Sequence, residues 1–251
     1  MHLTILGSGS FLPHEKRNCS GYLLDIGDET LLLDGGSGTL RQMVKAERSV
    51  LEVGRVFYSH FHLDHTADFL PLLFTRKYYK PQRPNAPLYI HAHPDFAYYF
   101  DNLTKMFEKW TADPDYPTYF SPITPGMHDF SSYQVQVFPS NHAPESQMYR
   151  FIGPDGESLL YTGDVGLDEI LINASRNVDL LLIECGNLSN VPIAGHLNPE
   201  QIKTVIEAAQ PQRVILTHLP PEVDNLDITE RFGPSLAKRI TIAEDFLTFD
   251  F

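Results

Sequence analysis

The stretch Ser59-His60-Phe61-His62-Leu63-Asp64-His65 packs three imidazoles and one carboxylate into six residues directly after an apolar, strand-like run. Alternate residues of an extended segment point to the same side, so the first two histidines can chelate one metal ion, while the aspartate and the third histidine face a second ion from the following turn. Imidazole and carboxylate ligands without a thiolate suit Zn²⁺, and also Mn²⁺ or Fe²⁺, in a site that keeps water as a ligand. The stretch therefore predicts a catalytic centre with two divalent ions.

This His-x-His-x-Asp-His spacing resembles the signature of the metallo-β-lactamase superfamily. The resemblance implies three further ligands: a histidine and an aspartate after later strands and a histidine near the C-terminus, which this chain offers as His142, Asp164 and His218. It implies that one ion is held by His60, His62 and His142, that the other is held by Asp64, His65 and His218, and that Asp164 bridges both. The fold that it implies is a four-layer αβ/βα sandwich of the α/β (α+β) class.

The strand pattern of the chain agrees with this ligand set. Four short apolar runs, each followed by one of the candidate ligands, read as strands: 56–58, 135–138, 159–161 and 214–216. Ligands at the C-terminal ends of several strands converge on one rim, which predicts a single centre. Taken alone, His142 or His218 could equally be a hydrogen-bonded structural histidine.

A second motif, Gly195-His196-Leu197-Asn198-Pro199-Glu200-Gln201, predicts a helix that extends through Ala209, because Asn198 and Gln201 form a capping-box pattern around Pro199. Its histidine would stand just ahead of the helix at the metal rim. The motif resembles the tRNase Z and phosphodiesterase branch of the superfamily, as do residues 5–10 and 17–20. In that branch such a histidine assists the leaving oxygen; the alternative here is a histidine that only packs.

One departure from the tRNase Z pattern concerns the arm that grips tRNA, which the resemblance puts between His142 and Asp164. Here this connection is short, and Gly153-Pro154-Asp155-Gly156 reads as a hairpin turn. The substrate expected is therefore a small-molecule or nucleotide-type ester, with tRNA as a partner only if an arm lies elsewhere. Homodimerisation is expected by analogy with this branch.

The mechanism implied is attack by a hydroxide that bridges two metal ions about 3.5 to 4 Å apart. Asp64 and Asp164 would position this nucleophile, and His196 would protonate the departing alkoxide as a general acid. Glu184, at the end of an apolar run, would support the ligand sphere from behind. The Gly-rich loop 34–38 reads as a tight turn near the same rim.

Three classes of function remain open from the sequence. A dinuclear phosphodiesterase leads, and hydrolysis of lactones, thioesters or sulfate esters on the same ligands is the alternative within the hydrolases. An iron-dependent oxidoreductase is the second class, which oxygen uptake by iron-loaded protein would favour. A binding module without catalysis is the third, disfavoured because all seven ligand positions are filled. A β-lactamase is disfavoured because Cys185 lies at no ligand slot.

Composition sets the frame for the fold. The 251 residues with 42% hydrophobic content and no evident linker predict one domain over 1–251. An aromatic, proline-rich segment at about 70–127 is expected as a helical insertion, with a helix from Pro94 whose apolar residues pack on a sheet or line a pocket or a subunit contact. The pair His91 and His93 lacks a following Asp-His and is expected to be structural.

Charge and targeting signals narrow the partners. A formal net charge of −13 disfavours polyanions over the surface as a whole, and the cluster Arg76, Lys77, Lys80 and Arg83 is expected to be a solvated helix end. The two cysteines, Cys19 and Cys185, are expected to be reduced and buried. No apolar run approaches the roughly 20 residues of a membrane span and no export signal is visible, so a cytoplasmic location without membrane contact is expected.

Overall fold

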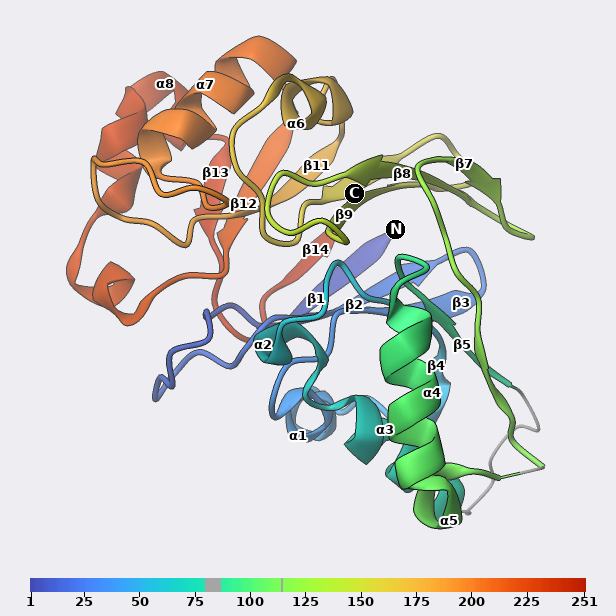
Figure 1. The fold of residues 1–251 in the computed structure, drawn as a ribbon. Helices are drawn as coiled ribbons and strands as arrows, with labels where there is room; N and C mark the ends of the chain where they lie inside the picture. The colour runs from blue at the N-terminus through green and yellow to red at the C-terminus, as the bar shows by residue number, and fades with distance from the viewer. Residues whose placement is uncertain (80–86, 114) are drawn as a thin grey trace.

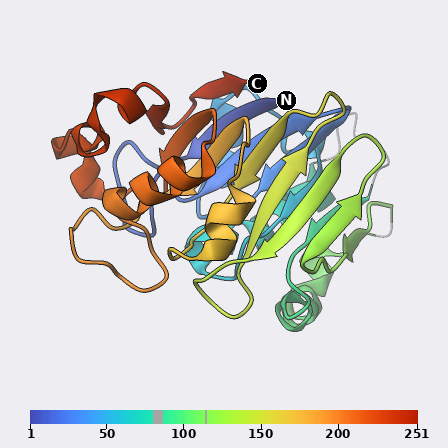
Figure 2. The same ribbon diagram turned by 90° about the horizontal axis from the view of Figure 1, so that it is seen from above.

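The computed structural model describes residues 1–79, 87–113 and 115–251 and shows two mixed β-sheets that face each other, with helices on both outer sides (Figures 1 and 2). The first sheet contains, in spatial order, β14 (Thr248–Asp250), β1 (His2–Gly7), β2 (Gly21–Ile26), β3 (Glu29–Leu33), β4 (Val53–Phe57), β5 (Leu88–His91) and β6 (Thr118–Phe120). The second contains β13 (Ile240–Ile242), β12 (Arg213–Thr217), β11 (Leu180–Glu184), β10 (Ser158–Tyr161), β9 (Gln147–Ile152), β8 (Gln134–Pro139) and β7 (Gly126–Asp129).

The helices are divided between the two outer faces in chain order. The N-terminal half carries α1 (Thr39–Lys45), α2 (Leu63–Thr66), α3 (Phe69–Tyr78), α4 (Phe96–Met106) and α5 (Glu108–Thr111), and the C-terminal half carries α6 (Glu169–Ala174), α7 (Pro199–Ala209) and α8 (Gly233–Ala237). Short 3₁₀ turns are η1 (Val50–Glu52), η2 (Pro221–Asn225) and η3 (Ile228–Phe232). Parallel pairs such as β3 with β4 and β11 with β12 need crossover connections, which place helices outside the sheets.

Three apolar clusters fill the spaces between these layers. The central cluster joins the inner faces of both sheets, as between Leu24 and Leu33 of the first and Val135 and Leu182 of the second. A second cluster lies between the second sheet and α6 and α7, and a third between the first sheet and α1, α3 and α4. Helix, sheet, sheet, helix is therefore the order of layers, and the predicted four-layer αβ/βα sandwich is confirmed.

The aromatic segment at 70–127 contributes strands as well as helices. β5 and β6 extend the first sheet beside β4, and β7 forms the edge of the second. The helix predicted from Pro94 begins at Phe96, which is buried against Tyr58, while Tyr98 on the opposite face is 72% exposed. Some aromatic side chains of this segment, such as Phe96, therefore pack α4 onto the first sheet.

Several smaller predictions are settled by burial. Arg76 is buried and donates to the carbonyl oxygen of Val53, so the prediction of a solvated helix end is wrong at this residue, because the guanidinium anchors α3 to the start of β4. Lys80 and Arg83 lie outside the described residues. Cys185 is buried as predicted, but Cys19 is only half-buried.

His91 has the structural role expected of it. It stacks on Phe57 with ring centroids 4.6 Å apart, and its Nδ1 lies 3.1 Å from the carbonyl oxygen of Ser121. Burial and the nearby guanidinium of Arg55 lower the pKa of His91 to about 4, so the ring is neutral at physiological pH.

Among the described residues, no helix is both long and apolar enough to cross a membrane.

Candidate metal centre

The candidate ligands come together at one edge of the two sheets, where several strands end. His60 follows β4 and His142 follows β8, while Asp164 follows β10 and His218 follows β12. The four strands predicted ahead of these residues are thereby confirmed. Because the first sheet supplies His60 and the second supplies the other three, the candidate centre lies at the junction of the two sheets.

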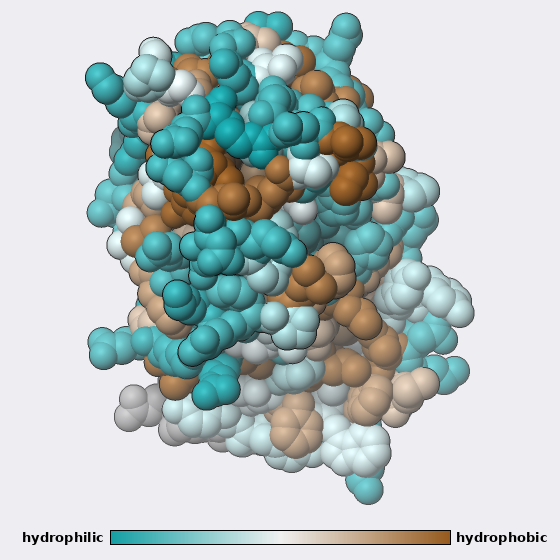
Figure 3. Space-filling model, turned by 90° about the vertical axis from the view of Figure 1, so that its left-hand side faces the viewer, coloured by the Kyte–Doolittle hydropathy of each residue, from teal (hydrophilic) through white to brown (hydrophobic). Residues whose placement is uncertain are grey.

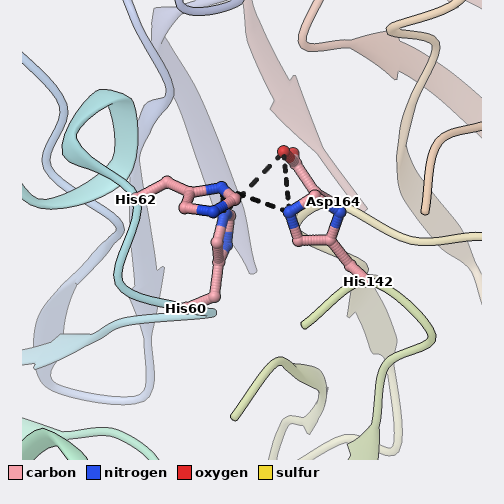
Figure 4. A group of neighbouring side chains, drawn as sticks. All are labelled: His60, His62, His142 and Asp164. Atoms are coloured by element: carbon pink, nitrogen blue, oxygen red, sulfur yellow. Dashed lines mark hydrogen bonds and ion pairs between the residues drawn. The ribbon is translucent and has the colours of Figure 1, made fainter. Parts of the chain in front are cut away.

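One group consists of His60, His62, His142 and Asp164, whose ligand atoms all lie within 4.8 Å of one another (Figure 4). Nδ1 of His62 is 3.0 Å from Nε2 of His60 and 3.2 Å from Nε2 of His142. Oδ2 of Asp164 lies 3.8 Å from both of these Nε2 atoms. Three ring nitrogens and one carboxylate oxygen thus face a common point, as a tetrahedral metal site requires.

A second group consists of Asp64, His65 and His218, and Asp164 faces it with its other oxygen. Nε2 of His218 is 3.2 Å from Oδ2 of Asp64 and 3.4 Å from Oδ1 of Asp164, while Nε2 of His65 is 3.3 Å from that same Oδ1. Asp164 is therefore placed between the two groups, with one oxygen toward each.

Two of the buried atoms in this second group, Nε2 of His65 and Oδ1 of Asp164, have no hydrogen-bond partner among the described residues. Unsatisfied buried polar atoms are costly, and such pairs in native proteins call for an explanation. A cation between them would satisfy both atoms at once. The donor set, all imidazole and carboxylate, fits a divalent ion of the zinc class.

The charges of the side chains point the same way. Burial alone would raise the pKa of Asp164, but the imidazoles of His218 and His65 outweigh it and hold that pKa well below its usual value. Burial alone would lower the pKa of His65, but the carboxylates of Asp164 and Asp34 raise it well above its usual value. Protons shared among clustered histidines and carboxylates are those that a bound cation displaces.

Asp34, at the end of β3, orients this cluster from behind. Its carboxylate accepts from Nδ1 of His65 at 2.7 Å, from the amide and hydroxyl of Ser59 at 2.7 and 2.6 Å, and from the hydroxyl of Tyr161. Because the Ser59 hydroxyl donates to Asp34, it accepts from Nδ1 of His60, 3.0 Å away. In both histidines Nδ1 therefore donates a hydrogen bond to this network, and Nε2 faces the candidate centre. This arrangement is typical of metal sites.

The sequence predicts a tight turn at 34–38 and does not predict this role for Asp34. The signal that could have found it is the parallel pairing of β3 with β4, which aligns Leu33 with Phe57 and so brings the residue after each strand to the same edge. This pairing joins strands that are 20 or more residues apart in the chain, so it is seen in the fold and not in the local sequence pattern.

Replacing Asp34 with Asn is expected to weaken metal binding by about 10- to 100-fold, because the neutral amide no longer fixes the tautomer and orientation of His65. Competition with a chromogenic chelator measures the affinity. Asp25→Asn, a change of the same kind on neighbouring β2, is the matched control and should leave the affinity unchanged. Equal affinities for wild type and Asp34→Asn would show that the carboxylate has no part in positioning the centre.

His196 stands ahead of α7, whose predicted capping box between Asn198 and Gln201 is confirmed. Its Nδ1 donates to Oε1 of the fully buried Glu184 at 3.0 Å. That hydrogen bond, together with the carboxylate charge, raises the pKa of His196 against the opposing effect of burial. The centroid of its ring lies 4.9 Å from that of His142, so Glu184 holds this imidazole beside the cluster.

The sandwich of two facing sheets and the His/Asp cluster at its edge define the class: this is a protein of the metallo-β-lactamase fold. Residues 1–240 match the family described as "Anti-Pycsar protein Apyc1", and the chain belongs to that family. The resemblance to this fold and to its tRNase Z and phosphodiesterase branch is confirmed by its relatives.

The "Probable metallo-hydrolase YhfI" of Bacillus subtilis is 29% identical over 234 residues, which cover 88% of this chain and 87% of the relative. The crystal structure of YhfI superposes with a TM-score of 0.80, at 25% identity, over 99% of this chain and 98% of the other. Ribonuclease Z of Chlamydia pneumoniae is 24% identical over 300 residues, covering 99% and 96% of the two chains. The crystal structure of human tRNase Z, short form, shares the fold with a TM-score of 0.79 at 20% identity, and the match covers 100% of this chain and 99% of the other.

Proposed function

We propose that this protein is a dinuclear metal-dependent hydrolase that cleaves phosphodiesters. The observation that carries the proposal is the pair of ligand groups that share Asp164, with the hydrogen-bonded pair of His196 and Glu184 beside them. One ion would be held by His60, His62 and His142, and the other by Asp64, His65 and His218. Asp164 would be a ligand of both ions. Zn²⁺ fits this donor set, and Mn²⁺ or Fe²⁺ would also be accepted.

Two divalent ions held there would supply Lewis-acid activation of water and of the phosphoryl oxygens. The residues of the chain would do the rest. Asp64 and Asp164 would accept hydrogen bonds from the attacking water and aim it at phosphorus. His196, whose protonated form is stabilised by Glu184, would donate its Nε2 proton to the departing alkoxide.

The connection between the ligand strands supports a small substrate. β9 and β10 form a hairpin closed by the predicted turn at 153–156, and the segment from His142 to Asp164 contains no projecting arm, all of its residues being described. A chain of net charge −13 without such an arm is poorly suited to grip tRNA. A small or nucleotide-type phosphodiester therefore fits better, although relatives of this chain are described as ribonuclease Z.

The test is hydrolysis of bis(p-nitrophenyl) phosphate by zinc- or manganese-loaded protein, with metal content measured on the same samples. Turnover that disappears in Asp64→Ala but persists in Asp101→Ala, an exposed carboxylate on α4, would support the proposal. Two bound metals without turnover of this or other phosphodiesters would overturn it and direct the search to lactones, thioesters and sulfate esters. Less than one equivalent of metal after loading would overturn the dinuclear site itself.

We also propose a homodimer, a cytoplasmic location and a single domain over 1–251, as the sequence led us to expect. The exposed aromatic residues of α3 and α4, including Phe74, Tyr78 and Tyr98, would serve a subunit contact. Light scattering coupled to size exclusion tests the oligomer, and a monomeric mass at micromolar concentration would contradict it.

A further inference from the structure

The loop between β11 and α7 ends in a tight turn at 193–196 that carries the candidate acid His196. The amide of His196 donates to the carbonyl oxygen of Ile193 at 3.2 Å, which closes the turn. Gly195, the third residue of the turn, has a φ of +80°, whereas Ala194 before it has a negative φ. A positive φ at the third position only is the mark of a type II turn, in which this position favours glycine.

The backbone of Gly195 also orients a candidate metal ligand. Its carbonyl oxygen accepts from Nδ1 of His142 at 2.9 Å, so the proton of the neutral ring lies on Nδ1 and Nε2 is free to bind an ion. The approach is close: a Cβ at position 195 would lie 2.9 Å from this Nδ1 and 3.4 Å from Cα of His142. Glycine is therefore required here for two reasons, the turn and the contact with His142.

The same turn places two groups of the candidate centre. His196 directly follows Gly195, and its Nδ1 donates to Oε1 of Glu184. The carbonyl group that orients His142 belongs to the peptide bond between Gly195 and His196. A movement of this peptide would therefore displace the candidate acid and a ligand of the first group together.

Polar contacts, rather than apolar packing, hold the loop ahead of this turn. Val191 and Ile193 at its tip are exposed. The side chain of the buried Asn187 donates to the carbonyl oxygen of Val191 at 2.8 Å and accepts from the amide of Ser189 at 3.0 Å. The loop lies on the left-hand side of Figure 1, and Figure 3 shows this side of the molecule, with apolar areas in brown set among hydrophilic ones in teal.

Arg231, in η3, holds the loop from the outside. Its guanidinium donates from Nη1 to the carbonyl oxygen of Leu188 and from Nη2 to the side-chain oxygen of Asn190, both at 2.6 Å. It also forms a two-pronged ion pair with Glu200, in which Nε lies 2.8 Å from Oε1 and Nη2 contacts Oε2. Because Glu200 is in the first turn of α7, Arg231 ties the loop to the helix that follows His196.

From these contacts we infer that the turn at 193–196 positions the ligand His142 and the acid His196 together, and that Arg231 keeps the loop in this arrangement. Gly195 and Arg231 are positioning residues, since both act through the two histidines. The part of the inference that concerns His196 rests on the proposed phosphodiesterase function. The part that concerns His142 is about metal binding alone.

Gly195→Ala is expected to weaken metal binding by about 10- to 100-fold, because the imidazole of His142 must move away from the new Cβ. Competition with a chromogenic chelator measures this affinity. At saturating metal, kcat on a dinucleotide should fall by about 10²-fold, because the acid is displaced from its leaving group. The value of kcat on bis(p-nitrophenyl) phosphate should change little, because p-nitrophenolate departs without a proton.

Gly156→Ala is the matched control for backbone strain. Gly156 has a φ of +86°, close to that of Gly195, but no atom lies within 4 Å of a Cβ built there. This variant should lose stability like Gly195→Ala and keep wild-type metal affinity and wild-type rates on both esters. Thermal unfolding of both metal-free variants measures the shared effect of strain.

Arg231→Met tests the loop without placing an atom beside His142. Metal affinity and kcat on the dinucleotide should each fall by about tenfold, again with little change on bis(p-nitrophenyl) phosphate. Arg48→Met is the matched control, because Arg48 also forms a two-pronged pair, with Asp25, and its side chain is 22% exposed against 23% for Arg231. It should leave both quantities unchanged.

The two parts of the inference can fail separately. Wild-type metal affinity in folded Gly195→Ala would overturn the role of the turn in positioning His142, and equal losses of kcat on the two esters would overturn its role in positioning the acid. If Gly195→Ala does not fold, wild-type affinity and a wild-type ratio of the two rates in Arg231→Met would overturn the inference. Absence of phosphodiester turnover in the wild type would defeat the proposed function, whereas chelator competition would still decide the part that concerns His142.

Discussion

Asp164→Ala is expected to abolish both metal retention at two equivalents per chain and turnover of a phosphodiester. Asp164 presents one carboxylate oxygen to each ligand group, at 3.8 Å from His60 and 3.3 Å from His65. Its removal takes one donor from both groups. On the side of the centre, Nε2 of His65 then has the carboxylate of Asp64, 3.6 Å away, as its nearest acidic neighbour among the described residues. Loss of an outer partner alone costs about 10- to 100-fold in affinity or activity, so loss of this shared ligand should cost more.

Metal content by mass spectrometry and kcat/KM on bis(p-nitrophenyl) phosphate are the measurements. Asp155→Ala, an exposed carboxylate in the turn between β9 and β10, is the matched control and should retain both metals and full activity. Thermal unfolding of the metal-free proteins separates a lost site from a lost fold. Two equivalents of metal retained by a folded Asp164→Ala protein would rule out the shared ligand.

The sequence predicted the elements whose signals are local. The spacing of His60, His62, Asp64 and His65 places them on one strand end and one short helix, and α7 was predicted from its capping box, since both patterns span fewer than eight residues. The run ahead of His142 forms a strand whose residues alternate between buried and more exposed, and the runs ahead of Asp164 and His218 form strands that are buried on both faces. Such features depend on neighbours along the chain.

The features that the sequence did not reveal depend on partners far along the chain. Asp34 meets Ser59 across 25 positions and Tyr161 across 127, and no periodicity links them. Arg76 looked like a solvated helix residue because its acceptor is a backbone carbonyl of β4, which any sequence supplies. The sharing of Asp164 between two ligand groups likewise needed the packing of one sheet on the other, which a resemblance implies but strand patterns alone do not.

His196→Ala is expected to lower kcat by about 10²- to 10⁴-fold for substrates with an alkoxide leaving group, the usual contribution of a general acid. For substrates that release p-nitrophenolate, kcat should fall far less in this variant, because this leaving group departs without a proton. The hydrogen bond and charge of Glu184 raise the pKa of His196, which extends the protonated form of the acid to higher pH, and wild-type activity on alkyl esters should fall as pH rises through that raised pKa. The pH profile of kcat for the variant should lack this decrease at alkaline pH.

Measurement of kcat against pH for a dinucleotide and for bis(p-nitrophenyl) phosphate separates the two roles open to this histidine. A general acid gives a large loss on the dinucleotide and a small one on the nitrophenyl ester. Equal losses on both would mean instead that His196 supports the cluster through its contacts with His142 and His218. His128→Ala, which removes a histidine of β7 whose Nε2 lies 2.7 Å from the carbonyl oxygen of Thr124, is the matched control and should change neither rate. Because a packing role cannot distinguish between leaving groups, the ratio of the two losses decides the role independently of any change in stability.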